Sequence, residues 1–345
     1  MTEPPLPPDL SPRRQATALR TRPRPASGRA RRRRWPRRLG LALLAVVLVL
    51  AMVLLGTWIW ADGKIRRTDA IADWPGRPAH VAGTNWLLVG SDSRAGLTRA
   101  QQRALHVGSD AGTNTDTLMV LHKGANGPVL LSIPRDSWVT VPGHGQSKIN
   151  AAFAEGGPQL LVRTVESATG IRIDHYLEVG FSGVTDTVDA LGGVRMCLGS
   201  AVRDSRSGAD LSAGCQKLTG RQALALVRTR YSLPDSDLSR IGNQQQFLHA
   251  LADTVVAPGV LADPFRLYPF LNAALDSVTV DRSSGLWTLA QCARQLQQAS
   301  GGKGKSLTVP LATQDYATPT GQSAVLWSDA AKTLFTEIRQ DRPVG

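Results

Sequence analysis

Aspartate and arginine residues recur at the edges of short apolar runs, and these side chains could do chemistry. They are Asp92, Arg94, Asp116, Arg135 and Asp136, followed later by Arg228, Arg230, Asp235, Asp237 and Arg240. In an extended stretch, Arg228 and Arg230 point to the same side, because side chains repeat every two residues. Two guanidinium groups on one side suit a phosphate or pyrophosphate, which they bind through paired hydrogen bonds.

Two of the carboxylates suit a divalent cation. Asp92 and Asp116 could share a Mg²⁺ (or Mn²⁺) ion that also touches phosphate oxygens, because such hard cations prefer oxygen ligands. A metal ion combined with arginine clamps is an arrangement that stabilises phosphoryl transfer. Ligands of open sheets bind at strand ends, where these residues are expected. The residues therefore predict a metal-assisted site for a phosphorylated substrate.

Other chemistries fit the sequence less well. The segment 299–306 is close to a phosphate-loop pattern, but a helix is expected before it and a strand after it, the reverse of what that motif needs. We therefore interpret it as a glycine-rich turn. The six histidines are scattered without zinc-type spacing, and the sequence contains no Gly-x-Ser-x-Gly elbow. Hydrolases built on a histidine or cysteine centre are poorly supported.

The elements that must position these residues alternate between strands and helices. Apolar runs predict strands at 86–89, 118–121, 129–133, 175–180 and 306–310, and helical periodicity predicts helices at 148–155, 158–168, 220–227, 237–256 and 284–298. Asn126-Gly127 predicts a hairpin between the second and third strands. Thr219 with Gln222 forms a capping-box pattern. We expect an α/β (α+β) domain in which a mixed central sheet is flanked by helices.

The charge of the chain is concentrated at its N-terminus. Residues 1–38 hold 12 arginines against two acidic residues, a net charge of +10 out of +13 for the whole chain. A nearly neutral body of this kind excludes a protein that binds nucleic acid with its whole surface. We interpret residues 1–38 as a disordered basic tail. The 22 residues 39–60 carry no charge and are long enough to cross a bilayer as an uncleaved helix.

The distribution of basic residues predicts the orientation of that helix. Seven arginines lie between residues 29 and 38, whereas Lys64, Arg66 and Arg67 follow the apolar run. The more basic side stays in the cytoplasm, so we expect a cell-membrane protein with a single span and an extracytoplasmic body. Residues 61–80 would form a stem, and residues 81–345 the catalytic domain.

The cysteines agree with an oxidising compartment. Cys197 and Cys215 are 18 residues apart around a polar loop, which a disulfide could close with a stabilisation of about 3 kcal/mol. Cys292 lies beside the apolar stripe of a predicted helix. We expect Cys292 to be a buried apolar group rather than a reactive thiol.

Six ordered motifs within residues 84–257 resemble the LytR-CpsA-Psr family. These are 88–94, 115–120, 132–136, Lys148 to Ala152, 189–194, and 220–224 leading into Arg228-Thr229-Arg230. The basic tail, the single anchor and the outer domain also resemble the family's layout, and the pair Cys197 and Cys215 resembles actinobacterial members. Asn114 and Asn243 stand where the family often has arginine, and we expect these departures to weaken pyrophosphate binding or shift specificity.

The resemblance implies a transferase that moves a glycopolymer from a polyprenyl-pyrophosphate carrier to peptidoglycan, typically to the muramic acid 6-hydroxyl, through a phosphodiester. It implies that Asp92 and Asp116 hold Mg²⁺ and that the polyprenyl chain lies in an apolar pocket between sheet and helices. It assigns pyrophosphate binding and catalysis to Arg94, Arg135, Arg228, Arg230, Arg240 and Asp237, and substrate binding to Gln244, Asp136, Lys148 and Asn150.

Two other functions remain open. The same residues would serve a phosphatase that hydrolyses polyprenyl pyrophosphate, and the chain could instead be a non-catalytic membrane-bound regulator or attachment protein. The group that takes the proton from the acceptor hydroxyl is also open among Asp92, Asp116 and Asp237, or the metal-bound phosphate suffices.

Overall fold

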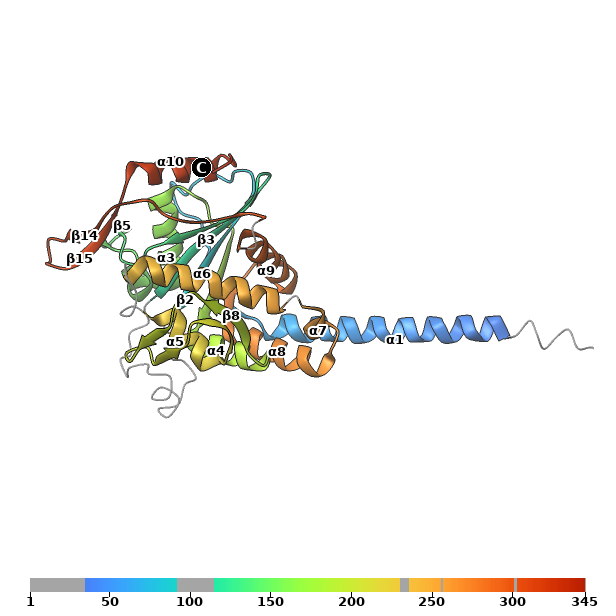
Figure 1. Cartoon of the computed structure of the whole chain (residues 1–345). Helices are drawn as coiled ribbons and strands as arrows, with labels where there is room; N and C mark the ends of the chain where they lie inside the picture. Colours follow the sequence, from blue (N-terminus) through green and yellow to red (C-terminus); the bar gives the residue numbers. More distant parts are fainter. Residues whose placement is uncertain (1–34, 92–114, 230–235, 256, 301–302, 345) are drawn as a thin grey trace, which may run out of the picture. The chain divides into compact units, whose positions relative to one another are not determined.

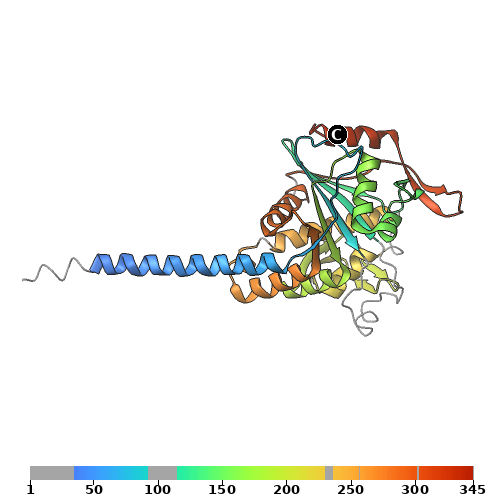
Figure 2. The ribbon, with the colours of Figure 1, turned by 180° about the vertical axis from the view of Figure 1, so that it is seen from behind.

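The computed structural model describes residues 35–91, 115–229, 236–255, 257–300 and 303–344. The chain divides into two compact units, residues 1–56 and residues 57–345, and the second unit is called the body below. Figures 1 and 2 show its ribbon from opposite sides. Its elements, with helix α1 that leads into it, are α1 (Trp35–Lys64), β1 (Arg66–Thr68), β2 (Thr84–Ser91), β3 (Thr115–Gly124), β4 (Gly127–Ile133), β5 (Trp138–Val141), β6 (Gly145–Lys148), α3 (Ala151–Thr169), β7 (His175–Gly180), α4 (Phe181–Ala190), β8 (Val194–Leu198), β9 (Val202–Asp204), β10 (Ala209–Leu211), β11 (Gly214–Leu218), α5 (Gly220–Arg228), α6 (Ser236–Val255), α7 (Pro258–Leu261), α8 (Pro264–Ser277), β12 (Val278–Asp281), α9 (Leu286–Ser300), β13 (Lys305–Thr308), β14 (Leu311–Ala317), β15 (Ser323–Trp327) and α10 (Asp329–Arg339).

A seven-stranded sheet in the order β1-β12-β7-β2-β3-β4-β13 forms the centre of the body. Strand β3 pairs antiparallel with β2 and with β4, whereas β7 pairs with β2, and β13 with β4, in parallel. Ala125 and Asn126 connect β3 to β4, and Gly127, the first residue of β4, has φ +93°, a backbone angle that glycine adopts without strain. The predicted mixed sheet and the predicted hairpin are confirmed.

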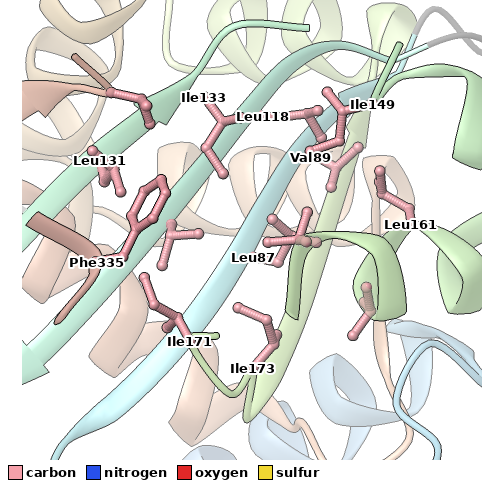
Figure 3. Packing of buried hydrophobic residues seen from close by; sticks show 14 of the residues in the cluster. Leu87, Val89, Leu118, Leu131, Ile133, Ile149, Leu161, Ile171, Ile173 and Phe335 are labelled. Atoms are coloured by element: carbon pink, nitrogen blue, oxygen red, sulfur yellow. The ribbon is translucent and has the colours of Figure 1, made fainter. Parts of the chain in front are cut away.

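The two faces of the sheet bury different side chains, because successive residues of a strand point to opposite faces. Leu87 and Val89 of β2 face a cluster that contains residues of α3 and α10, shown in Figure 3. Trp86 and Leu88 face the other way, toward α6 and α9. Figure 1 shows α6 crossing in front of the sheet, and Figure 2 shows α3 on the opposite side. Helices therefore cover both faces.

A second layer beside α6 is built from α4, α5 and short hairpins. Strands β8 and β11 pair antiparallel, with Cys197 directly opposite Cys215, and the two cysteines form the predicted disulfide. Their closed loop contains the hairpin β9–β10. Its inward residues join a buried cluster with α5 and with Phe247 of α6. The loop is therefore packed against the helices that carry Arg228 and Gln244.

The segment expected to form a stem contributes directly to the body. Strand β1 pairs in parallel with β12 at the edge of the sheet, and Ala61, Ile65 and Ala70 are buried. The segment was predicted to be a stem because most of its residues are polar. It packs in the body instead because its few apolar side chains are buried there. In the part of the chain that the structure describes, one helix, Arg38–Lys64, is long and apolar enough to cross a membrane.

The locally encoded helices agree with the sequence pattern. Helix α5 opens on the capping box of Thr219 and Gln222, with both reciprocal bonds present. Helix α3 joins the two predicted segments, and non-helical backbone at Gly156 and Gly157 marks the break between them. Cys292 is buried on α9, as expected.

Candidate functional site

A cavity of about 850 Å³ lies against the face of the sheet that α6 and α9 cover. Most of its wall is apolar and comes from β2, β3, β7, α6, α8 and α9. The apolar lining includes Leu88, Met119, Leu177, Leu248, Leu251, Leu267, Phe270, Leu271, Leu289 and Leu296. A cavity of this size and composition suits a ligand with a long apolar portion.

The lining becomes polar at one edge of the sheet. The end of β2, the start of β3 and the end of β4 meet there, since Gly90 pairs with Thr117, and Leu118 with Ile133. The polar and charged lining residues are Ser91, Asp116, Thr117, Arg135, Asp136, Lys148, Asn150, Thr187, Asp204, Arg206, Ser207, Arg228, Gln244 and Ser277. Seven of these residues were predicted for the site, namely Asp116, Arg135, Asp136, Lys148, Asn150, Arg228 and Gln244. The fold therefore gathers motifs that are far apart in sequence.

Arg135 is the centre of a charged network at the polar edge. Its Nη1 donates to Asp116 Oδ1, and its Nε lies 3.3 Å from Asp136 Oδ2. Lys148 Nζ lies 3.1 Å from the other oxygen of Asp136. The backbone N–H of Asn150 donates to the Arg135 carbonyl over 3.2 Å, which fixes the loop after β4 to the end of β6. These four charged side chains are only about a fifth exposed (19–24%), so their fields act with little screening by water.

Arg228 and Gln244 reach the cavity from two helices. Arg228 is the last residue of α5, where a cation is favourable because helical carbonyls point toward it. The prediction of an extended stretch is therefore wrong at Arg228, because the capping box starts a helix that continues to that residue. Gln244 Nε2 donates to the Val227 carbonyl over 3.2 Å, and this bond joins α6 to the end of α5.

Two buried hydroxyl groups at the same edge have no hydrogen-bond partner among the described residues. They are Ser91 Oγ, in the cavity wall, and Thr115 Oγ1, its neighbour across β2 and β3. Both side chains are fully buried. Buried polar atoms normally find a partner, and a polar ligand at this end of the cavity is one group that would supply it.

The donor set is compatible with a hard divalent cation. Asp116 and Asp136 supply carboxylate oxygens at the cavity's polar edge, close to the unpartnered Ser91 hydroxyl. Mg²⁺ commonly takes one or two protein carboxylates and completes its shell with water and substrate phosphates. The part of the chain that the structure describes holds no group of three or more metal-ligating side chains.

Several predicted residues lie outside the described part of the chain. Asp92, Arg94 and Arg230 belong to segments that the structure does not describe. Asp237 and Arg240 fall within α6, but their side chains are outside the described set. Their placement in the site stays a prediction.

The structure adds residues that the sequence did not single out. Asp204, Arg206 and Ser207 line the cavity from the disulfide-closed loop. Ser207 Oγ lies 3.1 Å from the hydroxyl of Thr229, the residue after Arg228. The cysteine spacing predicted that the loop is closed. It gave no sign that the closed loop lies next to the arginine motif in space.

Fold and cavity together define a class of α/β proteins in which a large apolar chamber opens into a cluster of arginine, lysine and carboxylate groups. Comparison with family models identifies the class. Residues 72–333 match the LytR_cpsA_psr family model, and the chain belongs to this family.

Curated relatives carry cell-wall names. The chain is 45% identical over 299 residues to the probable cell wall biosynthesis protein LcpB of Corynebacterium glutamicum, covering 86% of this chain and 69% of that protein. It is 37% identical over 175 residues to the polyisoprenyl-teichoic acid–peptidoglycan teichoic acid transferase TagT of Bacillus subtilis, covering 48% of this chain. The chain spans about half (51%) of the length of TagT.

Solved structures show the same fold. The LytR-Csp2A-Psr enzyme from Actinomyces oris superposes with a TM-score of 0.62 at 20% identity, covering 80% of this chain and 96% of that one. TagT bound to LI-WTA superposes with a TM-score of 0.55 at 24% identity, covering 81% of this chain and 97% of that one.

Proposed function

We propose that this protein transfers a glycopolymer from a polyprenyl-pyrophosphate carrier to peptidoglycan, with the muramic acid 6-hydroxyl as acceptor. The observation that carries the proposal is the cavity of about 850 Å³, apolar along most of its wall and lined at one edge by Arg135, Lys148 and Arg228. Such a shape matches an amphiphile with a long apolar chain and an anionic head. The name of TagT, a teichoic acid transferase, supports the same class of reaction, and the name of LcpB supports a role in cell wall biosynthesis.

The reaction replaces one phosphoanhydride bond by a phosphodiester bond. The oxygen of the acceptor hydroxyl forms a bond to the phosphorus that carries the glycopolymer. The bond between that phosphorus and the bridging oxygen breaks, and polyprenyl monophosphate leaves with the electron pair. The hydroxyl proton goes to a carboxylate of the site, for which Asp92, Asp116 and Asp237 are the candidates, or to solvent.

The side chains at the polar edge bind and orient the pyrophosphate. Guanidinium groups bind phosphate oxygens through two parallel hydrogen bonds, and this role falls to Arg135 and Arg228. Lys148 and Gln244, which also line the cavity, supply further donors. The contact of Arg135 with Asp116 fixes the guanidinium in place before substrate binds, which reduces the reorganisation needed during the reaction.

Mg²⁺ or Mn²⁺ is part of the proposal. Asp116 would hold the ion together with Asp92, which follows the last residue of β2. When bound, the ion would neutralise charge on the phosphate oxygens.

We also propose that α1 anchors the protein as a single span, with the tail in the cytoplasm and the body outside. The excess of arginine before the apolar run supports this orientation. The disulfide between Cys197 and Cys215 agrees with it, since disulfides persist in oxidising compartments.

The proposal is tested with the full-length chain in lipid nanodiscs, supplied with Mg²⁺, a synthetic polyprenyl-pyrophosphoryl oligosaccharide and peptidoglycan fragments. Mass spectrometry of the products reveals a phosphodiester-linked adduct. The test variants are Asp116→Ala and Arg228→Ala. Arg203→Ala is the matched control, because Arg203 lies on the exposed side of β9, pairs with Asp210 and does not line the cavity.

An adduct that both test variants lose and the control variant keeps supports the transferase. Cleavage of the lipid without an adduct favours the phosphatase. No turnover and no binding of the lipid by the wild-type chain would refute both enzymatic functions and favour a non-catalytic regulator.

A further inference from the structure

In the described part of the body, the large apolar side chains that are exposed lie at the end of α1 and on the two helices next to it, α8 and α9. Three of them, Trp58, Ile59 and Trp60, lie on the last turns of α1. The other three are on α8 and α9: Phe265 is 90% exposed, Trp287 62% and Tyr268 39%. Exposed side chains of this kind, gathered on one side of a protein, mark an interaction surface.

Contacts within the body place α8 alongside the last turns of α1. The hydroxyl of Tyr268 lies 2.5 Å from Thr57 Oγ1, and the rings of Tyr268 and Trp60 are 5.9 Å apart. Further along both helices, Lys64 Nζ donates to Asn272 Oδ1 over 2.5 Å. The two helices therefore run in the same direction there, as Figure 1 shows.

These contacts show which residue of α1 lies beside each aromatic side chain of α8 and α9. Tyr268 lies at the level of Thr57, and Phe265 comes three residues before Tyr268, about 4.5 Å earlier along α8. The N–H of Leu286 donates to Asp62 Oδ1 over 3.0 Å, which places Trp287 close to the level of Asp62.

The levels correspond to a membrane–water interface. The uncharged run ends at Trp60, and Asp62 follows about 3 Å later along the helix. Tryptophan and tyrosine are enriched at the interface, where the ring is apolar and the polar group stays hydrated. Phe265, which has no polar group, lies on the apolar side of this level, and Lys64 lies on the aqueous side, bonded to Asp276.

The elements that carry these aromatic residues also form the apolar wall of the cavity. Leu267 and Leu271 of α8 and Leu286 of α9 line it. Leu271 and Leu286 also pack against the cluster that holds Ala61 and Ile65. The apolar part of the cavity is thus separated from the exposed aromatic residues by a single layer of helices.

We propose that Phe265, Tyr268 and Trp287 form, with Trp58 and Trp60, an aromatic surface that inserts into the bilayer interface. The occupant of this surface is lipid, because it is continuous with the end of the candidate membrane span. The surface seats α8 and α9 against the bilayer, so that a long apolar chain passes from the membrane into the cavity without crossing water. This second step rests on the proposed function, whereas the membrane contact does not.

Membrane contact is tested by fluorescence quenching of the full-length chain in vesicles whose lipids carry bromine near the headgroup. The chain has eight tryptophans, so Trp287→Phe is compared with Trp327→Phe. Trp327 packs on Phe335 and donates to Ser137, away from the aromatic surface. The ratio of emission in brominated vesicles to emission in plain vesicles should rise for Trp287→Phe, because a quenched fluorophore is lost. It should fall for Trp327→Phe, and a fall for both variants would overturn the membrane contact.

Substrate entry is tested with Phe265→Glu/Trp287→Glu, whose exposed positions tolerate charge without loss of folding. Ala330→Glu/Thr333→Glu is the control, because it places the same two charges on exposed positions of α10. Turnover of a long-chain substrate held in vesicles should fall about tenfold in the double variant, since carboxylates are unfavourable in the interface. Turnover of a short-chain, water-soluble analogue should stay within about twofold of wild type, because this analogue reaches the cavity from water and does not depend on contact with the bilayer.

The two substrates separate the possible results. An equal loss with both would show that the aromatic surface acts through the fold, and no loss with either would show that lipid does not enter there. If the wild-type chain turns over neither substrate, the proposed function fails, and the quenching ratio still decides the membrane contact.

Discussion

Removal of Arg77 should destabilise the body strongly, because Arg77 neutralises a carboxylate with no access to water. Glu166 of α3 is fully buried, and the Arg77 side chain is 6% exposed. Arg77 Nη2 lies 3.1 Å from Glu166 Oε1 and donates to the Ile173 carbonyl over 2.9 Å. Burial raises the pKa of Glu166 above its ordinary value even though Arg77 lowers it. Without Arg77 the carboxylate would be buried and unpaired.

We expect Arg77→Ala to lower the free energy of unfolding by about 3–5 kcal/mol at pH 7.5, the range for breaking a buried ion pair. Adding Glu166→Gln should recover much of this loss, because a neutral amide keeps the bond from the Ile173 N–H, which is 2.8 Å from Glu166 Oε1 in the wild type. Asp73→Asn is the control. Asp73 also binds Arg77, but its side chain is 86% exposed and screened by water, so we expect the urea midpoint of Asp73→Asn to stay close to that of wild type.

The loss in Arg77→Ala should depend on pH. The folded-state pKa of Glu166 would then lie well above its unfolded-state value, so the folded chain binds more protons than the unfolded chain. The free energy of unfolding therefore falls as pH rises above the unfolded value of 4.5, by up to about 1.4 kcal/mol per pH unit, until pH passes the folded-state pKa. Below that window the variant should approach wild type.

The assay is urea unfolding of the full-length chain in detergent micelles at pH 5.0 and pH 7.5, followed by tryptophan fluorescence. Equal losses in Arg77→Ala and Arg77→Ala/Glu166→Gln at pH 7.5 would refute the reasoning. The same holds if the loss in Arg77→Ala does not shrink at pH 5.0.

Three further predictions concern the sheet edge, the disulfide and the cavity. The His175 ring and hydrogen bonds from Ser283, Ser284 and the Tyr176 N–H hold the pKa of Asp281 below its usual range in spite of burial. Asp281 therefore stabilises the fold above pH 3.8, and its contribution is lost as pH falls further. Acid titration should show Asp281→Asn less stable than wild type at pH 6 but with a smaller further loss below pH 4. Replacing Cys215 by Ser opens a loop of 18 residues and should cost about 3 kcal/mol in urea unfolding, and a similar loss in wild type after reduction is the check. Gln244→Ala should lower kcat/KM about 10- to 100-fold, the range for one hydrogen bond to a charged group such as the pyrophosphate. Its free energy of unfolding should fall by about 1 kcal/mol, because the bond to the Val227 carbonyl is lost. An equal effect on kcat/KM from Gln246→Ala, which bonds Cys197 outside the cavity, would contradict this.

Short-range signals predicted the elements well, because their causes are local. The Asn126-Gly127 turn produces the β3–β4 hairpin, and the pair Thr219 and Gln222 starts α5. Alternation along β2 separates the side chains of the two sheet faces. Each of these features depends on residues within a few positions of one another.

One error had a local cause. Arg228 was expected in an extended stretch, yet the helix begun by the capping box includes it.

The local view failed where distant elements decide the structure. Residues 61–80 look polar overall, but β1 finds a partner in β12, more than 200 residues away in the chain. Pairing between distant strands has no signature in either strand alone.

For the candidate site, the sequence by itself determined the chemistry: which residues bear carboxylate, guanidinium and amide groups, and that apolar runs end beside them. Only the tertiary structure decided which of these groups meet, since the end of β4 brings Arg135 to Asp116 across 19 positions. It also brought Arg206 to the cavity from the disulfide-closed loop, and the aromatic residues of α8 and α9 to the end of α1. The physical reason is that side-chain type is a property of single residues, whereas proximity results from burying apolar surface across the whole chain.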